Sequence, residues 1–429
     1  MRIRTKKFLA WLWVGLCTLS ILMIVPLART IQRFVSAHGG RALFGYTVIG
    51  ATAVAFCALI YVLFFHLKIR SVSQYVWLAL IAGFYIYYTL RLWKAPEEAV
   101  HFLEYGLLGF FLFRALSLTT QDKSIYFAAF FAGSLVGICD EIFQWAVPGR
   151  YWDLRDVGLN ALAAGLFQVA LWKGVKPRII HQATSGKSIQ KVSILLGANL
   201  LLLGICLSNT PKAVAWYTRI FPKLAFLQKE EAMSEFRYKH KDPEIGVFYS
   251  RLSLEELKRG DAERAEDYGR RLNEWKDKNY DDFLRTFTGS THPFLYELRI
   301  HLFRRDRKYK EAMKATDEAQ KKNLLFIAYK ENLTAQKYFS RTLKGSVYEW
   351  PKEKIEKIQA QIDPSLPYSS PVGSGPLAAL KIKTMWLLIA IVLAVLAILN
   401  ILIRRSQRHP FPPFPPLFKE DMGEKVNLL

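Results

Sequence analysis

The stretch from Gly137 to Gln168 reads GICDEIFQWAVPGRYWDLRDVGLNALAAGLFQ, and the prediction of the fold starts from it. Two apolar runs flank a short polar turn, and charged and amide side chains crowd the ends of the runs that face this turn. An ionisable group near the centre of a membrane costs at least about 2.5 kcal/mol. We therefore expect these side chains to be functional; they are Asp140, Glu141, Gln144, Arg150, Asp153, Arg155, Asp156 and Asn160.

The composition is typical of a membrane protein. The 429 residues are 52% hydrophobic and 14% aromatic, and apolar runs of about 20 residues are the signature of membrane-spanning helices. The net charge of +23 fits basic loops that face anionic lipid, so we expect membrane lipid as a partner and no nucleic acid. The four cysteines lie in apolar runs without the CxxC spacing that suggests zinc or redox chemistry. We expect no metal site and no cofactor, although carboxylates could also bind a divalent cation through oxygen ligands, with no diagnostic spacing.

Eight apolar segments predict an all-α, polytopic membrane protein with about eight spans. The first segment follows MRIRTKK and has no clear small-x-small cleavage site, so we expect an uncleaved helix rather than a signal peptide. Lys and Arg are concentrated in the loops on the side of the N-terminus, which predicts that both termini are cytoplasmic. The segments are 8–27, 44–66, 74–92, 99–118, 124–147, 156–172, 192–210 and 384–403.

These patterns divide the chain into seven regions. They are a two-span N-terminal segment (1–73), a four-helix membrane core (74–172), a loop with the seventh span (173–210), a helical extracytoplasmic domain (211–363), a linker (364–383), the final span (384–403) and a Pro-rich cytoplasmic tail (404–429). The linker, PSLPYSSPVGSGP, is expected to be extended and mobile. The tail is expected to be unstructured or to form a polyproline II docking peptide.

The extracytoplasmic domain contains two stretches with apolar residues at helical spacing, FYSRLSLEELKRGDAERAEDYGRRLNEW and LYELRIHLFRRDRKYKEAMKATDEAQ. We expect polar breaks at Gly260–Asp261 and Arg305–Asp306, each followed by a helix with small Ala residues on one face. Tetratricopeptide-like hairpins and a generic helical bundle are both compatible, because the units begin about 47 residues apart rather than 34. A domain of this kind would bind an envelope protein partner.

The fourth span begins with PEEAVHFLEYG and enters from the same predicted surface as the polar turn. His101, Glu104 and Tyr105 share one helical face, because they are spaced at i, i+3 and i+4. Three segments should therefore bring polar side chains together at the outer leaflet. Glycines are expected to permit close packing of these helices; they are Gly106, Gly109, Gly133, Gly137, Gly158 and Gly165.

Three motifs in this region resemble the VanZ-like family: an HxxxY motif, DExxQ, and PGRxxDxxDxxxN before a helix rich in small residues. The resemblance covers about residues 75–172 and implies a bacterial plasma (inner) membrane protein of the cell envelope. The family is named for a member that confers resistance to the glycopeptide teicoplanin, and it implies no catalytic role for any residue. The matching residues are His101 and Tyr105; Asp140, Glu141 and Gln144; and Pro148, Gly149, Arg150, Asp153, Asp156 and Asn160, with Gly165 following.

Three functions are compatible with this cluster. The first is binding of an envelope lipid head group or a glycopeptide-type ligand at the outer leaflet. The second is an enzyme acting on a phosphorylated or lipid-linked substrate, with His101 or Glu141 as acid or base and Arg150 and Arg155 holding phosphate. The third is structural: the arginines pair with neighbouring carboxylates and the helical domain recruits partners. No known catalytic motif decides whether the protein is an enzyme.

Overall fold

The computed structural model describes residues 3–148, 150–228, 232–235, 237–289, 291–373 and 382–408. The chain divides into two compact units. One contains Met1–Cys139, Arg155–Leu200 and Ile389–Leu429, and the other contains Asp140–Leu154 and Leu201–Leu388. Residues 374–381 of the predicted linker and residues 409–429 of the predicted tail lie outside the described residues.

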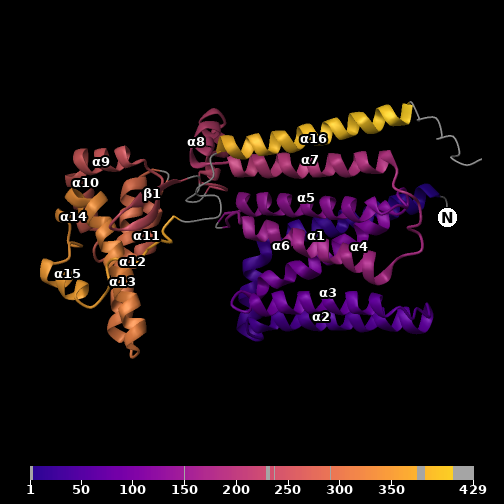
Figure 1. The fold of residues 1–429 in the computed structure, drawn as a ribbon, viewed down its shortest axis with the longest axis horizontal. Helices are drawn as coiled ribbons and strands as arrows, with labels where there is room; N and C mark the ends of the chain where they lie inside the picture. Colours follow the sequence, from indigo (N-terminus) through magenta and orange to yellow (C-terminus); the bar gives the residue numbers. More distant parts are fainter. Residues whose placement is uncertain are drawn as a thin grey trace, which may run out of the picture. The chain divides into compact units, whose positions relative to one another are not determined.

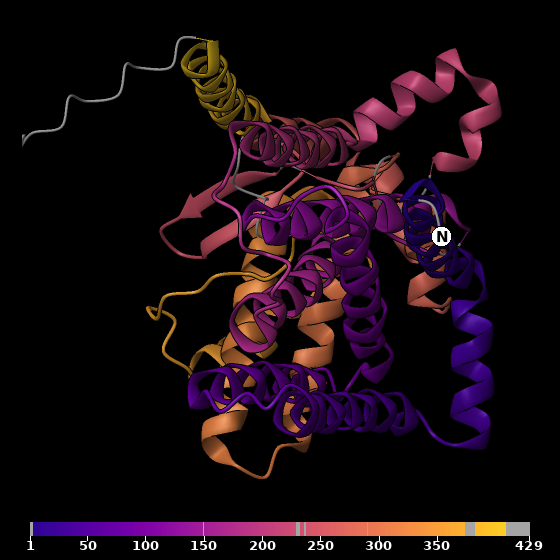
Figure 2. The same cartoon turned by 90° about the vertical axis from the view of Figure 1, so that its right-hand side faces the viewer.

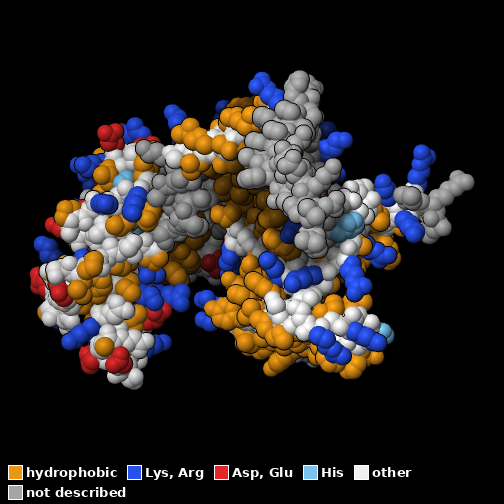
Figure 3. Space-filling view, turned by 45° about the vertical axis from the view of Figure 1, so that its right-hand side comes forward, with side chains coloured by type: hydrophobic (Ala, Val, Ile, Leu, Met, Phe, Trp, Pro, Cys, Tyr) orange, Lys and Arg blue, Asp and Glu red, His pale blue; other side chains and the backbone are white. Residues whose placement is uncertain are grey.

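The first unit consists of long apolar helices, and hydrophobic side chains cover much of their surface in Figure 3. Helix α1 packs against α4, and α2 lies beside α3 (Figures 1 and 2). The last parts of α5 and α7 and the first parts of α6 and α16 belong to the second unit. The elements are α1 (Ile3–His38), α2 (Ala42–Tyr61), η1 (Val62–His66), α3 (Val72–Arg91), η2 (Pro96–Val100), α4 (His101–Leu116), α5 (Ser124–Ala146), α6 (Leu154–Val169), η3 (Ala170–Val175), α7 (Gly186–Ser208) and α16 (Ile382–Arg408).

Within the described residues, seven helical segments are long and apolar enough to cross a membrane. The predicted segment 74–92 is the exception: it forms helix α3, but polar side chains lower its hydropathy. Two of these polar side chains donate hydrogen bonds to backbone carbonyls of other helices. Gln74 donates to Gly174 O at 2.7 Å, and the Tyr85 hydroxyl donates to Ala163 O at 3.1 Å. The protein is therefore an all-α polytopic membrane protein, and seven such segments lie within the described residues.

Small residues bring the membrane helices close together, as predicted for most of the glycines. A Cβ atom at Gly109 would lie 3.1 Å from Gln168 Nε2, which itself donates to Gly109 O at 3.1 Å. A Cβ atom at Gly133 would lie 3.1 Å from the Cβ of Ala164. The expectation for Gly158 is wrong, because no atom would lie within 4 Å of a Cβ there.

The loops of the first unit alternate between its two ends. At one end, Asp122 precedes α5, accepts from Ser124 N at 2.8 Å, and accepts from the hydroxyl of Ser188 in α7 at 2.6 Å. Burial raises the pKa of Asp122, but these hydrogen bonds outweigh it and lower the pKa. The loops before α2 and α4 meet at the opposite end, where Arg41 pairs with Glu97. This alternation is what the predicted succession of spans requires.

The second unit contains a helical domain, built from α8 to α15 with a short β-hairpin. Helices α12 and α13 form its central antiparallel pair (Figure 1), and the hydrophobic core includes Leu257, Leu298 and Phe339. Its elements are α8 (Pro211–Ile220), η4 (Pro222–Leu227), β1 (Tyr238–Asp242), β2 (Gly246–Ser250), α9 (Leu254–Glu263), α10 (Ala265–Glu274), α11 (Tyr280–Thr286), α12 (Pro293–Lys314), α13 (Glu318–Tyr338), α14 (Ser340–Lys344) and α15 (Lys352–Gln359).

Three expectations for this domain are wrong. The predicted helix at FYS is strand β2, which pairs antiparallel with β1, and α9 begins only after Ser253, whose side chain forms a capping box with Glu256. Helix α9 continues through Gly260–Asp261 and ends at Glu263. Helix α12 continues through Arg305–Asp306 to Lys314. The tetratricopeptide-like arrangement stays a prediction.

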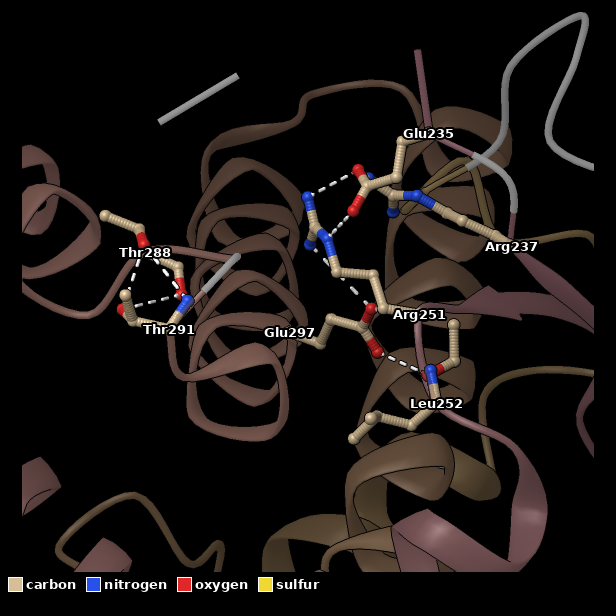
Figure 4. A network of polar contacts seen from close by, with 8 residues as sticks. Glu235, Arg237, Arg251, Leu252, Thr288, Thr291 and Glu297 are labelled. Carbon is tan, nitrogen blue, oxygen red and sulfur yellow. Dashed lines mark hydrogen bonds and ion pairs between the residues drawn. The ribbon is translucent and has the colours of Figure 1, made fainter. Parts of the chain in front are cut away.

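A network of charged residues attaches the hairpin to α12 (Figure 4). Glu297 accepts from Arg251 N at 2.7 Å and from the Ser250 hydroxyl at 2.5 Å. The Arg251 guanidinium donates to Glu235 Oε2 at 2.7 Å. Burial lowers the pKa of Arg251, but the charges of Glu235 and Glu297 outweigh it and raise the pKa. These contacts explain why this buried charge is tolerated.

The first part of the predicted linker is packed rather than mobile. Ser370 N donates to Val247 O at 2.8 Å, and Val247 N donates to Tyr368 O at 2.9 Å, so this segment pairs with β2. Gly246 has a φ of +107°, and a Cβ atom there would lie 2.2 Å from Tyr368 O. Only glycine fits this position without moving the segment.

Candidate functional site

The first part of the candidate site lies at the end of the first unit where the loops before α2 and α4 meet, and it includes Arg155 of α6. Pro96 begins η2, and its fixed φ suits the start of a helix. Glu97 accepts from Gln32 Nε2 at 2.7 Å and pairs with Arg41. Glu98 accepts from Arg155 Nη2 at 2.8 Å. Two adjacent carboxylates therefore join three separate segments of the chain.

One turn further along, His101 and Glu104 form a second polar layer on α4. His101 Nδ1 lies 3.2 Å from Glu104 Oε2, and both side chains are mostly buried. The ring of Tyr105 is fully buried, with its centroid 6.1 Å from that of His101. The predicted shared face of these three residues is therefore present in the structure.

The deepest layer is formed where α4, α5 and α6 approach one another at Gly137. A Cβ atom at Gly137 would lie 2.8 Å from Asn160 Cβ and 3.4 Å from Tyr105 Cε1. Asn160 is fully buried, and within the described residues neither its Oδ1 nor its Nδ2 has a hydrogen-bond partner. Burying an amide without hydrogen bonds costs roughly 1–3 kcal/mol in proteins. The fold therefore retains a polar group here at a cost.

We call this set the membrane polar group: Glu97, Glu98, His101, Glu104, Tyr105, Arg155, Asp156 and Asn160. Within the described part of the chain, Glu97 Oε2 and Glu98 Oε2 are also buried and lack a hydrogen-bond partner. Most buried polar atoms in proteins are hydrogen-bonded. Several polar atoms in one group that lack a partner indicate a place where an external donor or acceptor can bind.

The second part of the candidate site lies in the second unit, and we call it the turn group: Asp140, Glu141, Gln144, Arg150 and Asp153. Glu141 is fully buried; its Oε1 accepts from Gln144 Nε2 at 2.5 Å, and its Oε2 accepts from Asp153 N at 3.2 Å. Arg150 donates to the amide oxygen of Gln144. This chain of bonds ties the turn after α5 to the end of that helix.

The structure shows which side chains pair with the two arginines of the candidate site. Arg155 bonds to Glu98 and lies 3.8 Å from Asp156, and its side chain is 60% exposed. The predicted pair of Arg155 and Asp156 is therefore only a long contact. The hypothesis did not include Glu98 as a partner of Arg155, nor Gln144 as a partner of Arg150.

Sequence reasoning did not select four residues that the structure places in or beside the membrane polar group. Glu97 and Glu98 stand directly before His101, so the PEE sequence after the third helix was an available signal. Gln32 and Arg41 carry no local signal, because their partner Glu97 is more than 50 residues away in the sequence.

Among the described residues, no group of three or more His, Cys, Asp or Glu side chains is arranged to hold a metal ion. The membrane polar group offers carboxylates, an amide, a phenol, an imidazole and a guanidinium group. Such a set can bind hydroxyl, amine or anionic groups, and His101 beside Glu104 can transfer a proton.

The fold and the polar residues within its spans define a polytopic α-helical membrane protein. Residues 12–173 match the family model described as VanZ/LLP1, and this segment is VanZ-like. The match contains the whole membrane polar group and the turn group, and it also includes α2 and α1 from residue 12 onward, which the predicted resemblance left out. No curated protein and no solved structure matches the chain.

Proposed function

We propose that the VanZ-like segment binds a polar head group rich in hydroxyl or amine groups, carried by an envelope lipid or a glycopeptide-type ligand. The observation that carries this proposal is Asn160, a fully buried amide whose two polar atoms have no partner among the described residues. Because such an amide is costly, a bound ligand that supplies a donor and an acceptor is the simplest reason to retain it.

The carboxylates favour a donor-rich ligand over a phosphate. Glu97 and Glu98 each hold an arginine with one oxygen, while the other oxygen is buried without a hydrogen bond in the described residues. A carboxylate oxygen accepts hydrogen bonds, so it suits a hydroxyl or an ammonium group. The guanidinium groups of Arg41 and Arg155 are already paired, which leaves less positive charge for a phosphate.

The proposed function also implies a membrane and an orientation for the protein. The VanZ-like segment supports a bacterial plasma membrane, and the excess of Lys and Arg in alternate loops supports an orientation with both termini in the cytoplasm. The membrane polar group would then face the outer leaflet, where head groups and glycopeptides occur. The helical domain would be extracytoplasmic and recruit an envelope protein.

The substitution Asn160→Leu tests the proposal, because leucine has the same branched arrangement of side-chain heavy atoms and needs no hydrogen bonds. Full-length protein would be incubated with bacterial lipid extract and washed, and retained molecules identified by mass spectrometry. We expect Asn160→Leu to lose the retained ligand while the melting temperature stays the same or rises.

Asn199→Leu is the matched control, since the Asn199 amide donates to Phe131 O at 2.9 Å and to Leu195 O at 2.8 Å. We expect this variant to melt at a lower temperature and to keep the ligand. Full retention of the ligand by Asn160→Leu would contradict the proposal.

A second candidate function, acid–base catalysis, is favoured by one observation: His101 Nδ1 lies 3.2 Å from Glu104 Oε2. A histidine next to a carboxylate is a common arrangement for a general acid or base. The same lipid incubation separates the two functions. Modified lipid that disappears in His101→Ala supports catalysis, whereas retained but unmodified lipid supports binding alone.

A further inference from the structure

A basic cavity lies in the helical domain, next to α11 and α12. Its volume is about 480 Å³, within the usual range for small-molecule sites. Six of its lining residues are basic and two are acidic. The lining residues that matter for its charge are Lys276, Lys278, Arg299, Arg307, Lys310 and Lys314, opposed by Asp306 and Glu311.

The two acidic residues are already neutralised by their neighbours. Glu311 pairs with Arg307 at 2.9 Å and with Lys308 at 2.6 Å. Asp306 pairs with Arg305 at 2.9 Å and also accepts from the Trp350 indole at 3.2 Å. The cavity therefore keeps a clear excess of positive charge.

The environment of Arg299 indicates, independently of the excess positive charge, that this cavity can bind an anion. Its side chain is only 7% exposed, and within the described residues it has no hydrogen bond or ion pair. Its guanidinium instead lies over the rings of Tyr280 at 5.2 Å, Phe283 at 5.6 Å and Tyr348 at 5.0 Å. Aromatic rings hold a cation in place, but they do not satisfy its N–H donors. A buried arginine without an acid partner is costly, and a bound anion would compensate its charge.

We propose that this cavity binds a small phosphate-bearing molecule. A guanidinium group donates two parallel hydrogen bonds to a phosphate, and lysines add point charges. Lys310 and Lys314 lie one turn apart on α12 and line the same cavity as Arg299. The stacked rings of Tyr280 and Phe303, 3.9 Å apart, provide an apolar wall for the rest of the ligand.

The test uses the full-length protein in detergent and inorganic pyrophosphate as the probe, with binding measured by equilibrium dialysis. We expect saturable binding that weakens about tenfold in Arg299→Gln, because a hydrogen bond to a charged group is lost. The double variant Lys310→Gln/Lys314→Gln changes exposed residues and should weaken binding about tenfold without a change in melting temperature. It keeps the test decisive if Arg299→Gln does not fold.

Lys258→Gln/Arg259→Gln is the matched control, because both residues are exposed on α9 and outside this cavity. We expect it to bind pyrophosphate as the unmodified protein does. Equal weakening by the control, or no saturable binding in the unmodified protein, overturns the proposal. Adding phosphatidylglycerol to the micelles identifies the source of the phosphate: competition supports a lipid head group in this cavity, and no competition supports a soluble phosphate.

Discussion

Two carboxylates, one in each unit, differ greatly in how many hydrogen bonds they accept: Glu331 is fully buried, and Glu98 is partly buried. In the helical domain, Glu331 accepts from His301 at 2.5 Å, Arg304 at 2.9 Å, the Tyr368 hydroxyl at 2.5 Å and the Ser370 hydroxyl at 2.9 Å. In the membrane polar group, Glu98 bonds to Arg155 with one oxygen, while the other lacks a hydrogen bond within the described residues.

The difference shows how to separate structural from functional polar groups. A fully satisfied network specifies one packing arrangement and has no capacity left for a ligand. A partly satisfied group costs stability, so its presence calls for another reason, and ligand binding is the most direct one. The comparison makes opposite predictions for the same chemical change in the two units.

The largest effect is expected for Glu331→Gln. Glutamine would leave His301 and Arg304 without their anion, and the Tyr368 and Ser370 hydroxyls would each lose an acceptor. Removing one partner from a buried charge network costs about 3–5 kcal/mol. We expect denaturation of the full-length protein, followed by limited proteolysis of the helical domain, to show this loss.

The exposed residue Glu349 provides the control, and Glu349→Gln should change stability by less than about 0.5 kcal/mol.

The dependence of stability on pH gives a second measurement of the role of Glu331. Burial raises the pKa of Glu331, but the charge of His301 and the hydrogen bonds outweigh it and lower the pKa. Glu331 therefore stabilises the domain above the pKa of an unfolded glutamate, and this contribution disappears as the pH falls below it. This part of the acid sensitivity should be absent in Glu331→Gln.

An intermediate effect is expected for Gly137→Ala in α5. The new Cβ would lie 2.8 Å from Asn160 Cβ, so Asn160 or the helix must move. Overpacking of this kind costs about 1–3 kcal/mol. Gly158→Ala on α6 is the control, because nothing lies within 4 Å of its Cβ position. The melting temperature of Gly137→Ala should be lower than that of Gly158→Ala. Equal melting temperatures would show that Asn160 does not pack closely against Gly137.

The sequence was sufficient for features that depend on local pattern. Apolar runs predicted the positions of seven spanning segments, and helical spacing placed His101, Glu104 and Tyr105 on one face. The burial of Asn160 and the pairing of Glu98 with Arg155 were not predictable in this way. They depend on helices α5 and α6 approaching α4 and η2 in space, and no local pattern shows which polar atoms then lack a partner.

The incorrect helix breaks have the same cause. Asp261 lies inside α9 and accepts from the backbone N–H groups of Arg341 and Thr342, so it caps α14 about 80 residues later. Arg305 is only 1% exposed and bonds to Asn332 and to the carbonyl of Tyr348. Both residues look like solvent-exposed breaks in the sequence because their partners are distant.

The smallest effect on stability is expected for Glu98→Gln, the direct counterpart of Glu331→Gln. Glutamine keeps an acceptor for Arg155, and an ion pair with a 60% exposed arginine contributes only about 0–1 kcal/mol. The melting temperature should therefore change little. The amide removes the negative charge and one acceptor, so retention of a hydroxyl- or amine-bearing ligand in the mass-spectrometry experiment should fall. A loss of stability as large as that of Glu331→Gln, with the ligand still retained, would mean that Glu98 is a structural residue of the same kind.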